Sequence, residues 1–184
     1  MHDRLPPSSW VRRFAPLIPR GGTVLDLACG HGRHARLLAA LGYRVEAVDR
    51  DAEALATLAG VAGITTRVAD LEGGARPFAA ACFDGIVITN YLFRPRLNDL
   101  IGALKPGGVL IYETFMTGNE LLGKPANLEF LLRPGELLEV VRASLTVVAF
   151  EQGRVDNPKP AVVQRICAIA GEVTVLPPWS SPGG

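Results

Sequence analysis

The sequence has few cysteines, no long apolar run and no excess of charge of one sign, and each absence excludes a class of protein. Its three cysteines lie far apart and match no zinc site or redox pair, so we expect reduced thiols in a cytoplasmic protein. No apolar run reaches the roughly 18 residues that a membrane span needs, and the first residues lack the hydrophobic stretch of a signal peptide. With 19 basic and 18 acidic residues, the chain shows no bias toward nucleic acid.

The length and hydrophobic content indicate one globular domain. The chain has 184 residues, of which 48% are hydrophobic, and this is enough for a sizeable core. We expect this domain over residues 21–171, an N-terminal flap or helix over 1–20 and a flexible tail over 172–184. The sequence contains no internal repeat and no linker that would indicate a second domain.

Residues 24–41, VLDLACGHGRHARLLAAL, are the most informative stretch. They begin with an apolar run typical of a strand, turn through small residues that include Gly30 and Gly32, and continue with a helical pattern. Glycine lets a ligand approach the backbone closely, and a helix N-terminus suits an anionic group. The order strand, turn and helix predicts the first half of a βαβ unit. The helix residues that we expect on the inward face are Leu37, Leu38 and Leu41.

Acidic residues occur at the ends of three successive predicted strands. Asp26 belongs to the first, Asp49 ends the second and Asp70 follows the third. Because the carboxyl ends of parallel strands meet at one edge of a sheet, these carboxylates should lie along one crevice. A carboxylate about twenty residues after the glycines can accept hydrogen bonds from both hydroxyls of a ribose.

Residues 26–32 read Asp-Leu-Ala-Cys-Gly-His-Gly and resemble motif I of the class I S-adenosylmethionine (SAM) methyltransferases, usually acidic-x-Gly-x-Gly-x-Gly. Ala28 replaces the first glycine. Residues 104–115, LKPGGVLIYETF, resemble a later motif of this family, a turn that leads into the fifth strand. The resemblance covers roughly residues 20–170. It implies an α/β, Rossmann-like, doubly wound seven-stranded sheet, mostly parallel, with an antiparallel C-terminal hairpin over the runs 144–150 and 161–169.

The same resemblance implies SAM as the cofactor, with S-adenosylhomocysteine as its product. The glycine turn would hold the methionine portion, Asp49 the ribose, and Asp70 with the backbone of Leu71 the adenine. The residues expected to bind the cofactor are Asp26, Ala28, Gly30, Gly32, Asp49, Arg50, Asp70, Leu71 and Asn90.

Residues 30–35 also fit the dinucleotide fingerprint G-x-G-x-x-A. In nicotinamide enzymes, however, the glycines usually follow directly after an apolar strand. Here an acid and small residues precede them, and this suits a positively charged methionine portion better than a pyrophosphate. The chain also lacks a second domain for a hydride acceptor, so the sequence favours SAM.

Three residues are candidates for contact with the substrate. Trp10 lies in a short helix that Ser8 or Ser9 can cap, and this helix either packs on the edge of the core or forms a flap anchored by Trp10. Tyr91 shapes the pocket or faces the sulfonium through its ring, or else it covers the core at the rim. Glu113 either acts as a base or substrate contact, or is a solvated acid at a strand end.

Two further segments carry predictions about the pocket and the sheet. Residues 116–130 have little regular pattern, and we expect this loop to line or cover the substrate pocket. Pro134 suits the first position of a helix. The inward residues of that helix would be Leu137, Leu138 and Val141.

These observations favour methyl transfer from SAM to a small-molecule nucleophile by in-line displacement. A narrower resemblance, to tellurite-resistance-type and thiopurine-type enzymes, suggests sulfur, selenium or tellurium as the acceptor atom. The alternative is a SAM-binding sensor or partner subunit without turnover, since no residue is an unmistakable catalyst. Methylation of nucleic acid or protein is less favoured, because the near-neutral chain has no basic stripe studded with aromatic residues.

Overall fold

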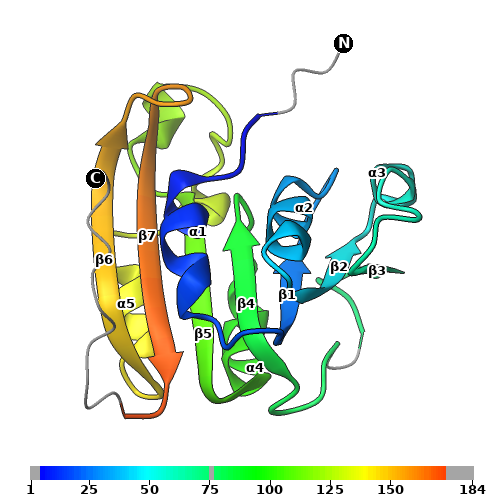
Figure 1. Ribbon diagram of the computed structural model, residues 1–184. Coiled ribbons are helices and arrows are strands. Elements are labelled where there is room, and N and C mark those ends of the chain that lie inside the picture. Colours follow the sequence, from blue (N-terminus) through cyan, green and yellow to red (C-terminus); the bar gives the residue numbers. More distant parts are fainter. Residues whose placement is uncertain (1–4, 75–76, 173–184) are drawn as a thin grey trace, which may run out of the picture.

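The structure is a computed structural model that describes residues 5–74 and 77–172. Seven strands form one sheet in the order β3-β2-β1-β4-β5-β7-β6, as Figure 1 shows. The strands are β1 Thr23–Leu27, β2 Arg44–Asp49, β3 Ile64–Val68, β4 Phe83–Thr89, β5 Leu104–Phe115, β6 Leu145–Val155 and β7 Ala161–Ala170. β1 to β5 pair in parallel, whereas β7 is antiparallel to both β5 and β6. The predicted fold, with its C-terminal hairpin, is confirmed.

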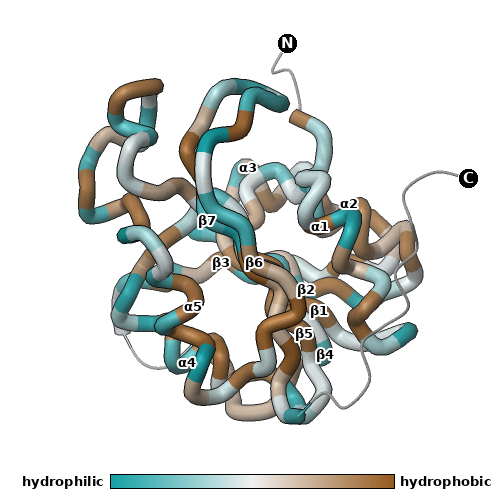
Figure 2. Tube along the Cα trace, turned by 90° about the vertical axis from the view of Figure 1, so that its left-hand side faces the viewer, coloured by the Kyte–Doolittle hydropathy of each residue, from teal (hydrophilic) through white to brown (hydrophobic). Residues whose placement is uncertain are grey.

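Helices cover both faces of the sheet. The α-helices are α1 Ser9–Phe14, α2 Arg33–Ala40, α3 Ala52–Ala56, α4 Leu97–Gly102 and α5 Glu136–Val141. Short 3-10 helices are η1 Ala15–Leu17, η2 Arg94–Arg96, η3 Asn119–Leu121 and η4 Leu128–Phe130. The side chains of α1, α2 and α3 belong to one buried cluster and those of α4 and α5 to the other. Figure 2 shows α4 and α5 on one side of the strands and α1 and α2 on the other.

The sequence forms α1 for local reasons and places it on the core. The Ser8 hydroxyl accepts a hydrogen bond from the N–H of Trp10 at 3.1 Å, which is an N-cap, and Pro16 follows the last turn. The indole of Trp10 is 2% exposed and donates to the carbonyl of Ile166 at 3.2 Å. Trp10 is thus a core residue of a packed helix, and it could reach a substrate only if α1 moved.

Two predictions of detail were wrong: one concerned the inward face of α2, and the other the first residue of α5. In α2 the buried side chains are His34, Ala35 and Leu38, whereas Leu41 is 50% exposed because it follows the helix as its C-cap. In α5 the N-cap is Gly135, so Pro134 precedes the helix instead of beginning it. Leu137 and Val141 are buried there as expected.

The Lys-Pro-Gly-Gly turn forms a bulge in β5. Phe83 of β4 pairs with Leu104, but Gly85 pairs with Val109, so four residues of β5 lie opposite one residue of β4. That one residue is Asp84, whose carboxylate pairs with Lys105 at 2.9 Å. The strand therefore starts earlier than the apolar run predicts, and the bulge sets the register of its buried half.

Within residues 5–74 and 77–172, no helix is long and apolar enough to cross a membrane. Residues 173–184 of the expected tail lie outside the described residues, and so do residues 1–4 of the N-terminal segment.

Candidate functional site

The turn between β1 and α2 places backbone at the carboxyl edge of the sheet. Ala28, Gly30 and Gly32 have φ angles of 52°, 54° and 71°, in the left-handed region. Such a conformation costs an alanine about 1–2 kcal/mol, so Ala28 is strained where the resembled family has glycine. A side chain at Gly32 would come within 2.5 Å of Leu58, whereas none of the described atoms lies within 4 Å of one at Gly30. The turn is therefore packed on one side and open on the other.

Three cavities follow this edge of the sheet. The first, about 190 Å³, lies between the ends of β2 and β3 and Tyr91. The second, about 320 Å³, surrounds the glycine turn, and the third, about 360 Å³, lies beside the tips of β5 and β7. Ala28 lines the first and second, while Leu5, Arg33 and Asn90 line the second and third. Because neighbouring cavities share lining residues, they adjoin one another along this edge, and we call the row of three the crevice.

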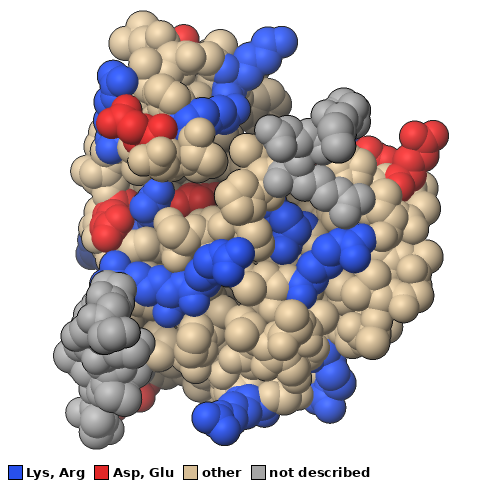
Figure 3. All heavy atoms as spheres, turned by 45° about the horizontal axis from the view of Figure 1, so that its top comes forward, with Lys and Arg blue, Asp and Glu red and all other residues tan. Residues whose placement is uncertain are grey.

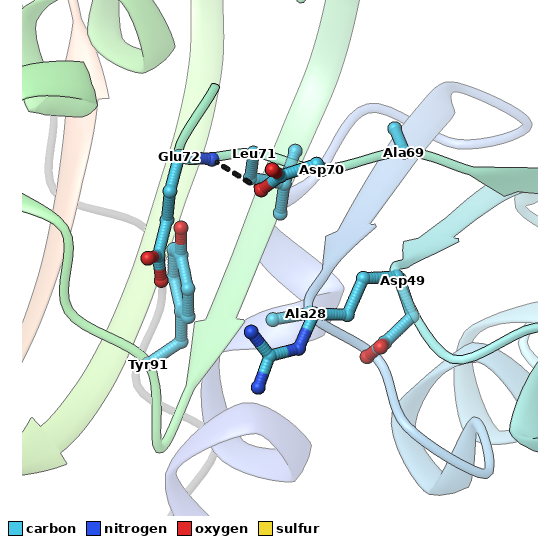
Figure 4. A pocket seen from close by; sticks show the side chains of 8 residues that line it. Ala28, Asp49, Ala69, Asp70, Leu71, Glu72 and Tyr91 are labelled. Carbon is cyan, nitrogen blue, oxygen red and sulfur yellow. Dashed lines mark hydrogen bonds between the residues drawn. The ribbon is translucent and has the colours of Figure 1, made fainter.

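Asp49 and Asp70 line the first cavity, as Figure 4 shows. Asp49 Oδ2 accepts from the N–H of Gly30 at 2.7 Å, and Oδ1 accepts from the N–H of Asp51 at 2.9 Å. Asp70 Oδ1 accepts from the N–H of Glu72 at 3.0 Å. Each carboxylate is held in place by the backbone and keeps lone pairs for further donors. Arg50 and Leu71 line the same cavity.

Asp26 lies two residues before the turn and is 1% exposed. Its Oδ2 atom is buried without a hydrogen-bond partner among the described residues. Burial raises the pKa of this carboxyl to about 7, against the opposing effects of the Ala35 backbone and the Arg33 charge. An unsatisfied buried oxygen is costly, and a cationic donor nearby would relieve that cost.

The two predicted residues after β4 occupy different parts of the crevice. Asn90, with a φ of 55°, lines the second and third cavities, and its N–H donates to the carbonyl of Glu113 at 2.9 Å. Tyr91 lines the first cavity, beside Asp49 and Asp70. Burial raises the pKa of its hydroxyl to about 12, and the hydroxyl oxygen has no partner among the described residues. The structure therefore brings Tyr91 to the end of the crevice where the adenosine portion is expected.

Glu113 lines the third cavity and forms an ion pair with Arg165. Their N–O distance is 2.6 Å, and both side chains are at most 15% exposed. The two residues lie directly opposite each other in the β5–β7 register, and Arg165 also approaches Glu151 at 3.5 Å. The carboxylate is therefore neither a solvated acid nor a free base, and its predicted contact with the substrate stays a prediction.

His34 is a buried member of the site that the sequence interpretation did not include. Its Nε2 atom accepts from the N–H of Ser8 at 3.1 Å, and its Nδ1 atom lies 3.3 Å from the hydroxyl of Thr89. Burial lowers the pKa of His34 to about 3, so the ring is neutral. Its neighbour Arg33 donates to the carbonyl of Pro6 at 3.2 Å. The only signal for these residues was their position in the first turn after the glycines.

The segment before α1 contributes one wall of the third cavity. Leu5, Pro6, Pro7 and Ser8 line it together with Ser9, the first residue of α1, and Arg33 and His34 hold this segment through the two hydrogen bonds just described. In contrast, no residue of the loop 116–130 lines any of the three cavities. The N-terminal segment, and not that loop, thus contributes lining residues to the second and third cavities.

Comparisons with known proteins agree with this fold. Residues 24–108 match the family model described as a methyltransferase domain. No curated protein matches the chain in sequence. Among solved structures, TehB from Haemophilus influenzae aligns with a TM-score of 0.73 and 21% identity over 88% of this chain and 61% of its own. This chain thus spans less than two thirds of that protein.

Two other solved structures are similar over most of both chains. A SAM-dependent methyltransferase from Methanosarcina mazei aligns with a TM-score of 0.68 and 16% identity, over 90% of this chain and 99% of its own. A 1,6-didemethyltoxoflavin-N1-methyltransferase from Burkholderia thailandensis, bound to 1,6-didemethyltoxoflavin and S-adenosylhomocysteine, aligns with a TM-score of 0.66 and 21% identity, over 89% and 79%. Over residues 24–108 the chain thus matches the model of a methyltransferase domain, and these solved structures share its fold.

Proposed function

We propose that this chain is a class I SAM-dependent methyltransferase, with SAM as its cofactor, and that it transfers the methyl group of SAM to a small-molecule nucleophile bound in the third cavity. The observation that carries this proposal is the row of three adjoining cavities, which extends from Asp70 past the glycine turn to Glu113. Its three parts match the order adenosine, methionine and acceptor. A cavity of about 360 Å³ falls within the range of small-molecule sites. Three free cysteines are consistent with a cytoplasmic enzyme.

The proposed cofactor contacts follow from the donors and acceptors along the crevice. Asp49 would accept the ribose hydroxyls, since its orientation is already fixed by Gly30 and Asp51. Asp70 and the backbone of Leu71 would bind the adenine edge, with Tyr91 against it. Asp26 lines none of the three cavities, so the cationic amino group would satisfy its unpartnered oxygen only by reaching past the residues of the glycine turn. Ala28 and Gly30 would let the methionine portion lie against the backbone, with Arg50 and Asn90 at the two ends. Gly32 lines none of the three cavities and would instead let the turn pack on Leu58.

Bound SAM supplies an electrophilic methyl group on a sulfonium, and the protein supplies position. Rigid placement of the nucleophile in line with the methyl group accounts for most of the expected acceleration. Residues 5–9 form one wall of the third cavity. Closure of this wall over bound ligands would exclude water and strengthen the electrostatic interactions inside the crevice.

Calorimetry with S-adenosylhomocysteine tests the cofactor site. Asp49→Ala should weaken binding by about tenfold or more, because two charge-assisted hydrogen bonds are lost. Glu53→Gln is the control, since Glu53 is an exposed acid on α3 that lines none of the three cavities. Equal affinity of Asp49→Ala and the wild type would overturn the proposed site. Transfer of labelled methyl to thiols, amines and phenols then separates an enzyme from a SAM sensor without turnover.

A further inference from the structure

The two ends of the crevice carry opposite charge. Three acids and one cationic side chain line the first cavity, namely Asp49, Asp70, Glu72 and Arg50. Three cationic side chains and one acid line the third cavity, namely Arg33, Lys159, Arg165 and Glu113. Figure 3 brings this edge of the sheet forward and shows Lys and Arg side chains gathered on it. The acidic end suits a cationic cofactor, and the basic end calls for a different ligand.

One of the three cationic side chains in the third cavity is already paired with carboxylates of the protein. Arg165 is paired with Glu113 at 2.6 Å and approaches Glu151 at 3.5 Å. Arg33 and Lys159, in contrast, form no salt bridge within the described part of the chain. Arg33 donates one hydrogen bond to a neutral carbonyl, that of Pro6. The cavity therefore holds two cations without a paired carboxylate.

Among its described residues, the same cavity offers no unpaired carboxylate or imidazole that could take a proton from the acceptor. The Glu113 carboxylate is held by Arg165. The neighbouring His34 accepts from Ser8 at Nε2, so its remaining proton lies on Nδ1 and points to Thr89. A neutral thiol, phenol or amine would have to lose its proton without help from these groups. An acceptor that is already an anion needs no such step.

We propose that the methyl acceptor is a small organic anion whose negative charge is bound by Lys159 and Arg33 in the third cavity. This inference rests on the proposed function. In the transfer, an electron pair of the anion forms the new bond to the methyl carbon while the carbon–sulfur bond breaks. The pair from that bond stays on sulfur, which becomes a neutral thioether. The positive charge of the sulfonium and the negative charge of the acceptor cancel, and no proton moves.

Arg33 lines the second cavity as well as the third, so it is also in reach of the carboxylate of the cofactor. Lys159 lines the third cavity and not the other two. It lies in the connection between β6 and β7 and is exposed, so its substitution should leave the fold intact. Lys159 is therefore the residue that separates acceptor binding from cofactor binding.

The experiment is a titration of the enzyme saturated with S-adenosylhomocysteine. Three probes of similar size and different charge are compared: benzoate, benzyl alcohol and benzylamine. Benzoate should bind about tenfold more tightly than the alcohol, because one charge-assisted contact contributes about this factor to affinity. Benzylamine should bind most weakly. Lys159→Gln should reduce benzoate affinity about fivefold or more without changing that for the alcohol.

Lys124→Gln is the matched control, because it removes the same charge from an exposed lysine outside the three cavities. It should retain the preference for benzoate. Three outcomes would overturn the inference. The alcohol binds as tightly as benzoate, benzoate does not bind, or the preference for benzoate over the alcohol survives both Lys159→Gln and Arg33→Gln. If S-adenosylhomocysteine still binds in that case, the proposed function stands. Loss of the cofactor site itself would appear in the calorimetry with Asp49→Ala.

Discussion

The backbone N–H of Ser8 donates a hydrogen bond to Nε2 of His34, which lies 26 residues further along the chain, at 3.1 Å. Because Nε2 accepts, the neutral ring carries its proton on Nδ1 and donates it to the hydroxyl of Thr89 at 3.3 Å. One imidazole thus joins the segment before α1 to the tip of β4. The wall of the third cavity is fixed to the same helix that begins at the glycine turn.

Replacing His34 by Phe should release this segment. The ring volume is kept, but both hydrogen bonds are lost, so the Ser8 amide should exchange with solvent about tenfold faster or more, corresponding to roughly 1–2 kcal/mol of lost protection. Hydrogen exchange measured at the Ser8 amide checks this. Ser8→Ala is the control, because it removes the helix cap and keeps the N–H. Unchanged protection in His34→Phe would show that the segment is held by other contacts.

Two buried groups should give the stability opposite dependences on pH. Burial lowers the pKa of His34 from 6.5 to about 3 and raises that of Asp26 from 3.8 to about 7. Below pH 6.5 only the unfolded chain protonates His34, so the free energy of unfolding falls as the pH decreases toward 3. Between pH 3.8 and 7 only the folded chain protonates Asp26, so the free energy of unfolding falls as the pH rises.

The two contributions should oppose each other over most of this range, and single variants should separate them. In urea unfolding of Asp26→Asn, the stability should fall on acidification more steeply than in the wild type, by up to about 1.4 kcal/mol per pH unit. His34→Asn should change the slope by a similar amount with the opposite sign. Parallel stability curves for the wild type and either variant would show that the group in question does not have the shifted pKa.

The two glycines of the turn should respond differently to alanine. In Gly32→Ala the new methyl would lie 2.5 Å from Leu58, at a φ of 71°, so we expect a loss of about 2–4 kcal/mol in denaturant unfolding. In Gly30→Ala the methyl meets no described atom within 4 Å, so the cost should be only the backbone strain of about 1–2 kcal/mol. Gly30 lines the second cavity, so its variant should instead weaken S-adenosylhomocysteine binding. Similar stabilities for the two variants would contradict this assignment.

Arg94 should stabilise the loop that follows β5. Its guanidinium pairs with Glu136 at 2.6 Å and donates to the carbonyls of Glu129 and Leu131 at 2.7 and 2.8 Å. Since the side chain of Glu136 is only 4% exposed, Arg94→Ala should cost about 3 kcal/mol in urea unfolding. Arg133→Ala is the control: it contacts the same carboxylate but is 69% exposed, so its side chain should contribute no more than about 1 kcal/mol. Equal losses in the two variants would rule out a special role for Arg94.

Local sequence was sufficient for most of the sheet, because strand, turn and helix signals act between near neighbours. The C-terminal hairpin forms from the two predicted apolar runs, and the glycine turn lies between β1 and α2 as its spacing required. Asp49 and Asp70 line one cavity, as the rule for parallel strand ends predicts. The capped helix at Ser8 also follows from its own sequence.

Features that depend on distant partners were not predictable in this way. The pair of Glu113 and Arg165 exists because the antiparallel register of β5 and β7 sets them opposite each other, and no local pattern defines that register. His34 faces inward in place of Leu41 because the first turn of α2 lies against the segment before α1, whereas its C-cap faces solvent. The bulge at Lys105 requires Asp84 from the neighbouring strand.

The position of β7 between β5 and β6 has a consequence for the order of folding during synthesis. The last strand of the sheet to leave the ribosome is an interior strand, and without it β5 presents an unpaired edge while β6 has no partner. Contacts between β5 and β7 join residues far apart in the chain, and such pairings form slowly. The nascent chain should therefore expose an aggregation-prone edge until residue 170 has emerged, so that translation speed and chaperones affect its yield more than its final stability does.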